Sequence, residues 1–370
     1  MILEKISILN YKNIGDVELQ FSPKVNCLIG NNGMGKTNVL DAIYFLSFCK
    51  SCTNQADSSV INHEAQYMML QGQYTRRDVA EHITLSMQRG KRKRVKRGDK
   101  EYKRLSQHIG LLPLVMVSPL DWDLIRGAGE ERRRLMNHII SQGDAVYLDA
   151  LIRYTKALEQ RNAMIKNEYR DPLLYETVEA QLCQAAAVIH SAREQWIAQF
   201  GPVFMRYYQA IAGGREQVEI IYKSHLAQAT MQQVLGANRE RDYIMGYTTG
   251  GVHRDDIELL LDGHSMRKTG SQGQCKTYTI ALRLAQYDFL KHNTGITPLL
   301  LLDDIFDKLD ASRVESIIDA VSDKRFGQIF ITDTNRTHLD EIINRLSDDY
   351  MMIAVDHGAC KPIVEGGAQP

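Results

Sequence analysis

The chain has 370 residues, in which 45 lysines and arginines balance 45 aspartates and glutamates, and 44% of its residues are hydrophobic. This is the composition of a globular protein of about two domains, which excludes disordered, collagen-like and fibrous chains. No apolar run approaches the roughly 18 residues of a membrane span and the N-terminal segment is charged, so we expect a cytoplasmic protein without a membrane partner or signal peptide.

A phosphate-binding loop is predicted near the start of the chain. Residues 25–29 are apolar and indicate a short strand, and apolar side chains recur at helical spacing over residues 39–46. The residues between them are Gly30, Asn31, Asn32, Gly33, Met34, Gly35, Lys36 and Thr37. This GxxxxGK[ST] pattern lets backbone N–H groups surround phosphates, while Lys36 neutralises their charge and Thr37 binds Mg²⁺. A nucleotide site is therefore favoured over a structural glycine-rich turn.

Positive charge is concentrated between Arg76 and Arg104, where 12 lysines and arginines face four acidic residues. Residues 82–87 alternate as in a strand and Arg97-Gly98-Asp99-Lys100 indicates a turn, so a basic β-hairpin is predicted. Such a surface suits the phosphates of nucleic acid, although the charges alternatively only protect an edge strand from pairing. The candidate DNA contacts, taken collectively, are Lys91, Arg92, Lys93, Arg94, Lys96 and Arg97.

The middle of the chain is predicted to be helical from about residue 130 to 212. Apolar residues recur in steps of three and four from Leu174 to Phe204, as in a stripe that packs helix against helix. Pro172 after Asp171 indicates a helix start or a break. Further on, His253-Arg254-Asp255-Asp256 has no nucleophile nearby in sequence and is interpreted as a structural or DNA-facing loop.

Two further segments have the residue types of a magnesium–nucleotide site. Ser271, Gly273 and Gln274 precede a predicted helix, where they form either an N-cap with a flexible turn or a second cradle for a phosphate. Residues 299–302 are all leucine and predict a strand buried in a parallel sheet, whose carboxyl end is where such sheets bind ligands. Asp303 is then expected to hold Mg²⁺, directly or through a bound water. Asp304 is placed to orient or deprotonate the attacking water, unless the pair is only a solvated turn.

The order of these motifs resembles that of ABC-type ATPase heads, and in detail that of the RecF family of bacterial DNA replication and repair proteins. The apolar strand ends in Asp-Asp and is followed by Phe306 and the residues 307–310 of a family motif. Other similar segments are residues 10–13, 117–121, 132–134, 246–256 and 330–332. The resemblance covers about residues 1 to 356.

The resemblance implies an α/β fold: an ABC-type P-loop ATPase head with an inserted helical arm domain that lacks a long coiled coil. SMC proteins place hundreds of coiled-coil residues in that insert, for which this chain has no room. The implied head consists of residues 1–125 and 245–370, and the implied arm of residues 126–244.

The resemblance also implies a weak, DNA-dependent ATPase with ATP and Mg²⁺ as cofactors. The Walker residues of one protomer and Ser271, Gly273 and Gln274 of the other would share each ATP, so that an ATP-dependent homodimer closes on duplex DNA or on a single-strand/duplex junction. Hydrolysis, with Asp304 as candidate base, would release the DNA. The resemblance to RecF proteins further implies that this protein acts with RecO and RecR. It would help RecA onto single-strand gaps and be linked to the SOS response.

The sequence departs from the family pattern at three places. Cys275-Lys276 replaces the usual Gln-Arg, Val252 replaces a common proline, and Asp333 stands where many ABC ATPases have a switch histidine that senses the γ-phosphate. An alternative function is the ATPase subunit of another complex, of the transporter type and without a DNA role. That alternative predicts a Leu-Ser-Gly-Gly-Gln signature and an apolar coupling surface, and neither is evident.

Overall fold

A computed structural model describes residues 1–53, 57–169, 171–214, 216–306, 311–322 and 325–363. Residues 307–310 of the family motif lie outside this described part. The chain forms two compact units, Met1–Asp121 with Ile280–Pro370, and Trp122–Thr279. The predicted boundary after residue 125 is close to the first division, whereas residues 245–279, expected in the head, belong to the second unit.

The first unit contains a sheet of the order β15-β14-β3-β13-β12-β8, in which only β15 is antiparallel. Its strands are β3 (Val25–Ile29), β8 (Leu114–Val117), β12 (Leu299–Asp303), β13 (Ile329–Asp333), β14 (Tyr350–Asp356) and β15 (Ala359–Pro362). All five residues of β12 are buried, as expected for a strand covered on both faces. The predicted strand that ends at Asp303 is confirmed, and so is the α/β fold class.

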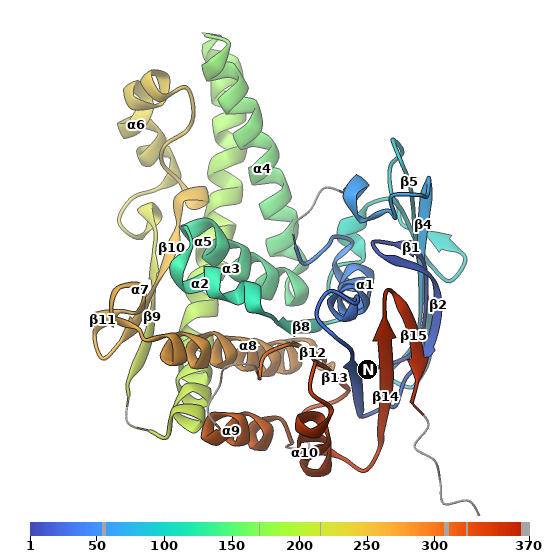
Figure 1. Ribbon diagram of the computed structural model, residues 1–370. Helices are drawn as coiled ribbons and strands as arrows, with labels where there is room; N and C mark the ends of the chain where they lie inside the picture. Colours follow the sequence, from blue (N-terminus) through green and yellow to red (C-terminus); the bar gives the residue numbers. More distant parts are fainter. Residues whose placement is uncertain (54–56, 170, 215, 307–310, 323–324, 364–370) are drawn as a thin grey trace, which may run out of the picture. The chain divides into compact units, whose positions relative to one another are not determined.

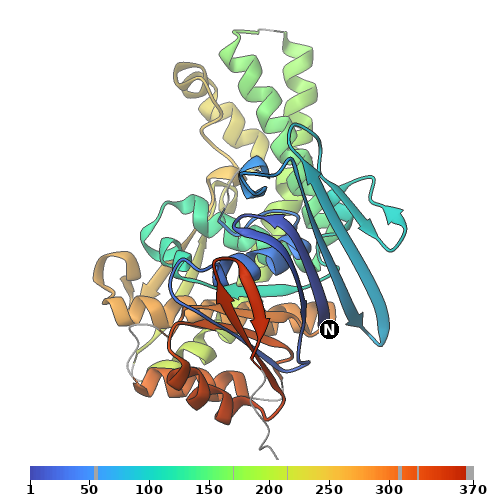
Figure 2. The same cartoon turned by 45° about the vertical axis from the view of Figure 1, so that its right-hand side comes forward.

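A second sheet of the first unit is antiparallel throughout, with the order β2-β1-β4-β5-β6-β7. Its strands are β1 (Ile2–Tyr11), β2 (Ile14–Gln20), β4 (Tyr67–Arg76), β5 (Val79–Gln88), β6 (Arg94–Arg97) and β7 (Lys100–Glu101). Figure 2 shows the long β4–β5 hairpin with the short strands beyond it. The predicted basic hairpin is therefore the β5–β6 pair, and residues 97–100 form the predicted turn into β7.

Helix α1 (Lys36–Phe48) contacts strands of both sheets (Figure 1). Eleven of its 13 residues are buried, which explains why its sequence is apolar nearly all round rather than on one face. One hydrophobic core joins Ile6 of β1, Leu28 of β3, Phe45 of α1 and Leu301 of β12. Helices α9 (Ala311–Ser322) and α10 (Arg336–Leu346) complete the described helices of this unit, beside the second half of α8 (Gln272–Thr294).

The second unit is mainly helical, as predicted for residues 130–212. Its helices are α2 (Trp122–Arg126), α3 (Gly129–Gly143), α4 (Ala145–Lys166), α5 (Pro172–Ala212), α6 (Met231–Met245), α7 (Met266–Thr269) and the first turns of α8. A small antiparallel sheet has the order β11-β10-β9 and consists of β9 (Val218–Lys223), β10 (Asp256–Leu261) and β11 (His264–Ser265). None of the described helices is both long and apolar enough to cross a membrane.

Helix α5 begins where the sequence indicates. Pro172 is its first residue, and the side chain of Asp171 accepts hydrogen bonds from the backbone N–H groups of Leu173 (2.9 Å) and Leu174 (3.4 Å). The predicted apolar stripe packs against neighbouring helices, but its first member, Leu174, is 41% exposed because Tyr175 takes the buried position there. The stripe also omits Arg193, which is 2% exposed and paired with Asp255.

Candidate nucleotide site

The predicted phosphate-binding loop connects β3 to α1 and takes its shape from three glycines. Gly33 (φ 81°) and Gly35 (φ 111°) adopt the left-handed conformations that side chains disfavour. A Cβ atom on Gly30 would lie 2.2 Å from the carbonyl oxygen of Val355 in β14, so close packing excludes a side chain there. The glycines of the motif are thus required by the backbone itself.

Two contacts hold the loop from outside. The side chain of Asn13 donates a hydrogen bond to the carbonyl of Met34 (3.3 Å) and accepts one from Asn38 (2.7 Å). The backbone N–H of Gly358 also donates to the Met34 carbonyl (2.8 Å). The motif pattern does not reveal these supports, because they come from the β1–β2 turn and the β14–β15 turn; the sequence indicates Asn13 only through the family resemblance of residues 10–13.

Lys36 and the start of α1 fit a bound phosphate chain. Lys36 is 4% exposed, and its ammonium group donates to the carbonyls of Gly30 (2.8 Å) and Asn31 (3.2 Å). No side chain caps the N-terminus of α1 and its first turn has no acidic residue. The uncapped helix start and the lysine therefore both present positive charge to the loop, which is what an anionic ligand requires.

Asp303 lies beside the loop, as its position at the end of β12 predicts. One of its carboxylate oxygens accepts hydrogen bonds from the hydroxyls of Thr37 (3.0 Å) and Thr332 (2.8 Å). Burial raises the pKa of Asp303 to about 6, while the hydrogen bonds from Thr332 and Thr37 oppose that rise. A buried carboxylate in contact with a threonine hydroxyl is an oxygen-rich site that fits Mg²⁺.

Asp304 follows in a left-handed backbone conformation (φ 47°), which is uncommon for residues other than glycine. Its backbone N–H donates to the Thr332 hydroxyl (3.0 Å), and its Oδ1 lies 3.5 Å from that hydroxyl. Thr332 thus links the two carboxylates, a role that no local pattern around residues 330–332 reveals. Strained backbone of this kind is concentrated at functional sites, but the role of Asp304 as base stays a prediction.

Ser271, Gly273 and Gln274, the predicted second phosphate cradle, lie at the start of α8 in the second unit. Ser271 caps this helix: its hydroxyl accepts from the backbone N–H of Gln274 (3.2 Å), and the Gln274 side chain accepts from the N–H of Ser271 (2.8 Å). The Gln274 amide also donates to Glu216 (2.7 Å). Ser271 remains exposed and Gly273 is half-buried. The N-cap interpretation is confirmed, and the role across a dimer stays a prediction.

The six candidate DNA contacts between Lys91 and Arg97 divide into two groups. Three of them are already paired: Lys93 donates to the Cys49 carbonyl (2.6 Å) and Asp57 (2.8 Å), Arg94 pairs with Glu101, and Arg97 pairs with Glu81. The other three are exposed and form no ion pair within the described part of the chain: Lys91, Arg92 and Lys96. The exposed group is therefore the part of the run that remains available to an external anion.

Comparison with known proteins places this site in a family. The family model described as RecF/RecN/SMC N terminal domain matches residues 2–357. The DNA replication and repair protein RecF of Parabacteroides distasonis is 53% identical over 365 residues, which are 99% of this chain and 100% of that protein. The protein of the same name from Bacteroides thetaiotaomicron is 52% identical over 371 residues and covers 100% of both chains.

Solved structures agree with this assignment. The recombination mediator protein RecF-ATP of the RecFOR pathway superposes with a TM-score of 0.89 at 26% identity, over 98% of both chains. An Smc head bound to the winged-helix domain of ScpA has a TM-score of 0.60 at 16% identity, over 98% of this chain and 97% of that one, a likeness in fold alone. The chain belongs to the RecF family of DNA replication and repair proteins.

Proposed function

We propose that this protein is an ATP-dependent DNA-binding clamp of DNA repair and replication-fork recovery. The observation that carries the proposal is the contact of the Thr37 hydroxyl with the buried Asp303 carboxylate, since this pair supplies the oxygen donors that a magnesium–nucleotide complex needs. The relatives are named as DNA replication and repair proteins, which favours this function over the transporter-type alternative.

The residues of the loop have separate tasks in this proposal. The Lys36 ammonium exchanges the carbonyls of Gly30 and Asn31 for phosphate oxygens, and the uncapped start of α1 adds backbone N–H groups. Thr37 and Asp303 would hold Mg²⁺, which would neutralise charge on the phosphates. Asp304 orients the attacking water or takes its proton, and the Thr332 hydroxyl contacts both carboxylates.

A second protomer completes each ATP site in the proposed mechanism. Ser271, Gly273 and Gln274 of one protomer face the triphosphate bound by the other, so that ATP binding closes a homodimer on duplex DNA or on a junction. Slow, DNA-stimulated hydrolysis reopens it. RecR and RecO are the proposed protein partners, loading of RecA at single-strand gaps is the proposed task, and the cytoplasm and the SOS response are its proposed setting.

Binding of the purified protein to duplex DNA tests this function directly. With ATP we expect retention that is lost with ADP or without nucleotide. Lys91, Arg92 and Lys96 of two protomers would neutralise roughly six phosphates, so the logarithm of affinity should fall with the logarithm of salt concentration at a slope of about −5. Fluorescence anisotropy over a salt series measures both effects. Equal binding with ATP and ADP would contradict a clamp.

Substitution of Ser271 by arginine tests the shared site. The larger, charged side chain should block dimer closure and reduce ATP-dependent DNA retention to the level seen with ADP, while the monomer binds ATP with unchanged affinity. Analytical ultracentrifugation and nucleotide titration separate the two properties. Ser191→Arg places the same side chain on the exposed face of α5 and should leave both unchanged. Loss of ATP binding by the monomer would count against action across the dimer.

A further inference from the structure

The four residues His253, Arg254, Asp255 and Asp256 divide between the interior and the surface of the second unit. His253 is bonded through both ring nitrogens, to the Tyr154 hydroxyl (2.7 Å) and the Thr248 carbonyl (3.0 Å), and burial lowers its pKa to about 4. Asp255 is fully buried beside Arg193. Arg254 instead is exposed, and within the described chain its guanidinium makes no ion pair or hydrogen bond, while its backbone N–H donates to the Gly251 carbonyl (2.9 Å).

The loop that carries Arg254 is fixed by buried polar contacts. Both the N–H and the hydroxyl of Thr248 donate to Asn162 (2.8 Å each). Arg161, which is 1% exposed, donates to Thr248 (2.8 Å) and to Asp242 (2.7 Å). These contacts fix the backbone of the segment that carries Arg254, so this segment loses little entropy when a ligand binds.

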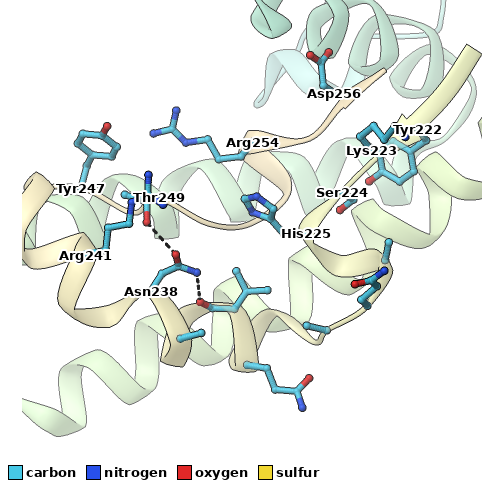
Figure 3. A pocket seen from close by; sticks show the side chains of 16 residues that line it. Tyr222, Lys223, Ser224, His225, Asn238, Arg241, Tyr247, Thr249, Arg254 and Asp256 are labelled. Carbon is cyan, nitrogen blue, oxygen red and sulfur yellow. Dashed lines mark hydrogen bonds between the residues drawn. The ribbon is translucent and has the colours of Figure 1, made fainter. Parts of the chain in front are cut away.

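Arg254 lies on the wall of a hollow of about 1000 Å³ that α6, the end of β9 and the following loop enclose (Figure 3). Arg241 and Lys223 line the same hollow. Arg241 has no ion-pair partner within the described residues, whereas Lys223 lies 3.4 Å from Glu258. The acidic lining residue, Asp256, is neutralised because Arg132 donates to both of its carboxylate oxygens (2.7 and 2.8 Å). The hollow is therefore positively charged.

The arginine arrangement suits phosphate groups. The guanidinium of Arg254 lies 5.1 Å from the ring centroid of Tyr247, and Figure 3 shows both near Arg241, with Lys223 farther along the hollow. Cation–π contact orients the guanidinium without occupying its hydrogen-bond donors. Two unpaired guanidinium groups offer paired donors that match phosphate oxygens better than an ammonium does.

The remaining lining residues favour a single strand over a peptide. The apolar side chains of the hollow are small, three alanines and Val234, so no deep pocket receives the large apolar anchor typical of peptide binding. The amide nitrogen of Gln233 offers a base-edge contact, and the rings of Tyr222 and Tyr247 offer stacking faces. A volume typical of small-ligand sites holds a few nucleotides and is too small for a duplex.

We propose that this hollow binds a short single-stranded stretch of DNA, with Arg241 and Arg254 on its phosphates. The inference rests on the proposed DNA function and assigns to this site the single-stranded arm of a junction. We expect binding there without ATP, because the lining contains no residue of the phosphate-binding loop and none of Ser271, Gly273 and Gln274.

Anisotropy titrations with a labelled thymidine hexanucleotide, without nucleotide, test the assignment. Arg241→Gln and Arg254→Gln should each weaken binding by about tenfold, and the double variant by more. Arg239→Gln is the matched control, since Arg239 is exposed on the same helix but pairs with Glu179 (3.1 Å). Thermal unfolding of each variant confirms that it is folded.

Two variants distinguish the proposed single-strand site from the proposed ATP-dependent clamp. The double variant should lose the hexanucleotide while it keeps ATP-dependent retention on blunt duplex DNA, and Lys36→Met should show the reverse. Unchanged binding of the hexanucleotide by the double variant would overturn the inference. So would displacement of the hexanucleotide by hexaglutamate at the same concentration as by unlabelled hexanucleotide, because the hollow would then be a site for acidic peptides.

Discussion

Replacement of Lys36 by methionine is expected to weaken ATP binding by roughly 10- to 100-fold and to abolish ATP-dependent dimerisation and DNA retention. Methionine keeps much of the apolar stem of the lysine but removes the ammonium group that bonds to the carbonyls of Gly30 and Asn31 in the loop. The phosphates would then lose their main neutralising side chain. Titration with a fluorescent ATP analogue measures the affinity, and sedimentation velocity measures the dimer.

Lys24→Met is the matched control for this variant. Lys24 is exposed just before β3, so the same chemical change there should leave ATP affinity and dimerisation unchanged. A Lys36→Met protein that unfolds at the temperature of the wild type yet retains DNA in the presence of ATP would remove the phosphate-binding loop from the proposed mechanism.

Replacement of Asp304 by asparagine is expected to slow ATP hydrolysis by about 10²- to 10⁴-fold, the usual contribution of a general base, and so to trap the dimer on DNA. Asparagine tolerates the left-handed backbone at this position, so the end of β12 should keep its shape. Phosphate release under single-turnover conditions measures the rate of the chemical step. The lifetime of the ATP-bound dimer on DNA shows whether the dimer is trapped.

Asp333→Asn controls for the loss of a carboxylate at the end of a neighbouring strand. Asp333 ends β13, which pairs with β12, and we assign it no catalytic role. Its asparagine variant should hydrolyse ATP within about threefold of the normal rate, well short of the effect expected for a base. If Asp304→Asn hydrolysed ATP as fast as the wild type, the base would have to be another group.

The parts of the site that sequence predicts are those with a local pattern. The loop from Gly30 to Thr37 is contiguous, and Asp303 follows an unbroken apolar strand, so residue spacing alone indicates both. Thr332 and Asn13 are different, because each acts on residues that are distant in the chain. Their neighbours carry no spacing that indicates which hydroxyl or amide will bridge to the site.

The fold, too, is predictable from the sequence only where a local pattern exists. The periodicity of α5 predicts a packed helix, and Asp171-Pro172 predicts its start. The same periodicity includes the exposed Leu174 and omits the buried Arg193, since burial there depends on a partner, Asp255, from another segment. The number of charged residues likewise indicates the basic run from Lys91 to Arg97. It does not indicate that Lys93 differs from its exposed neighbours by donating hydrogen bonds to Cys49 and Asp57, which belong to another segment.

The pairing of β3 has a consequence for biosynthesis. Both hydrogen-bonded neighbours of this strand, β13 and β14, come from the far end of the chain. On the ribosome, the strand that precedes the nucleotide loop is therefore made long before the strands that flank it, and the second unit is translated in between. Nascent chains should expose the apolar residues of β3 to chaperones during this interval, and ATP should stabilise only chains in which β14 has been synthesised.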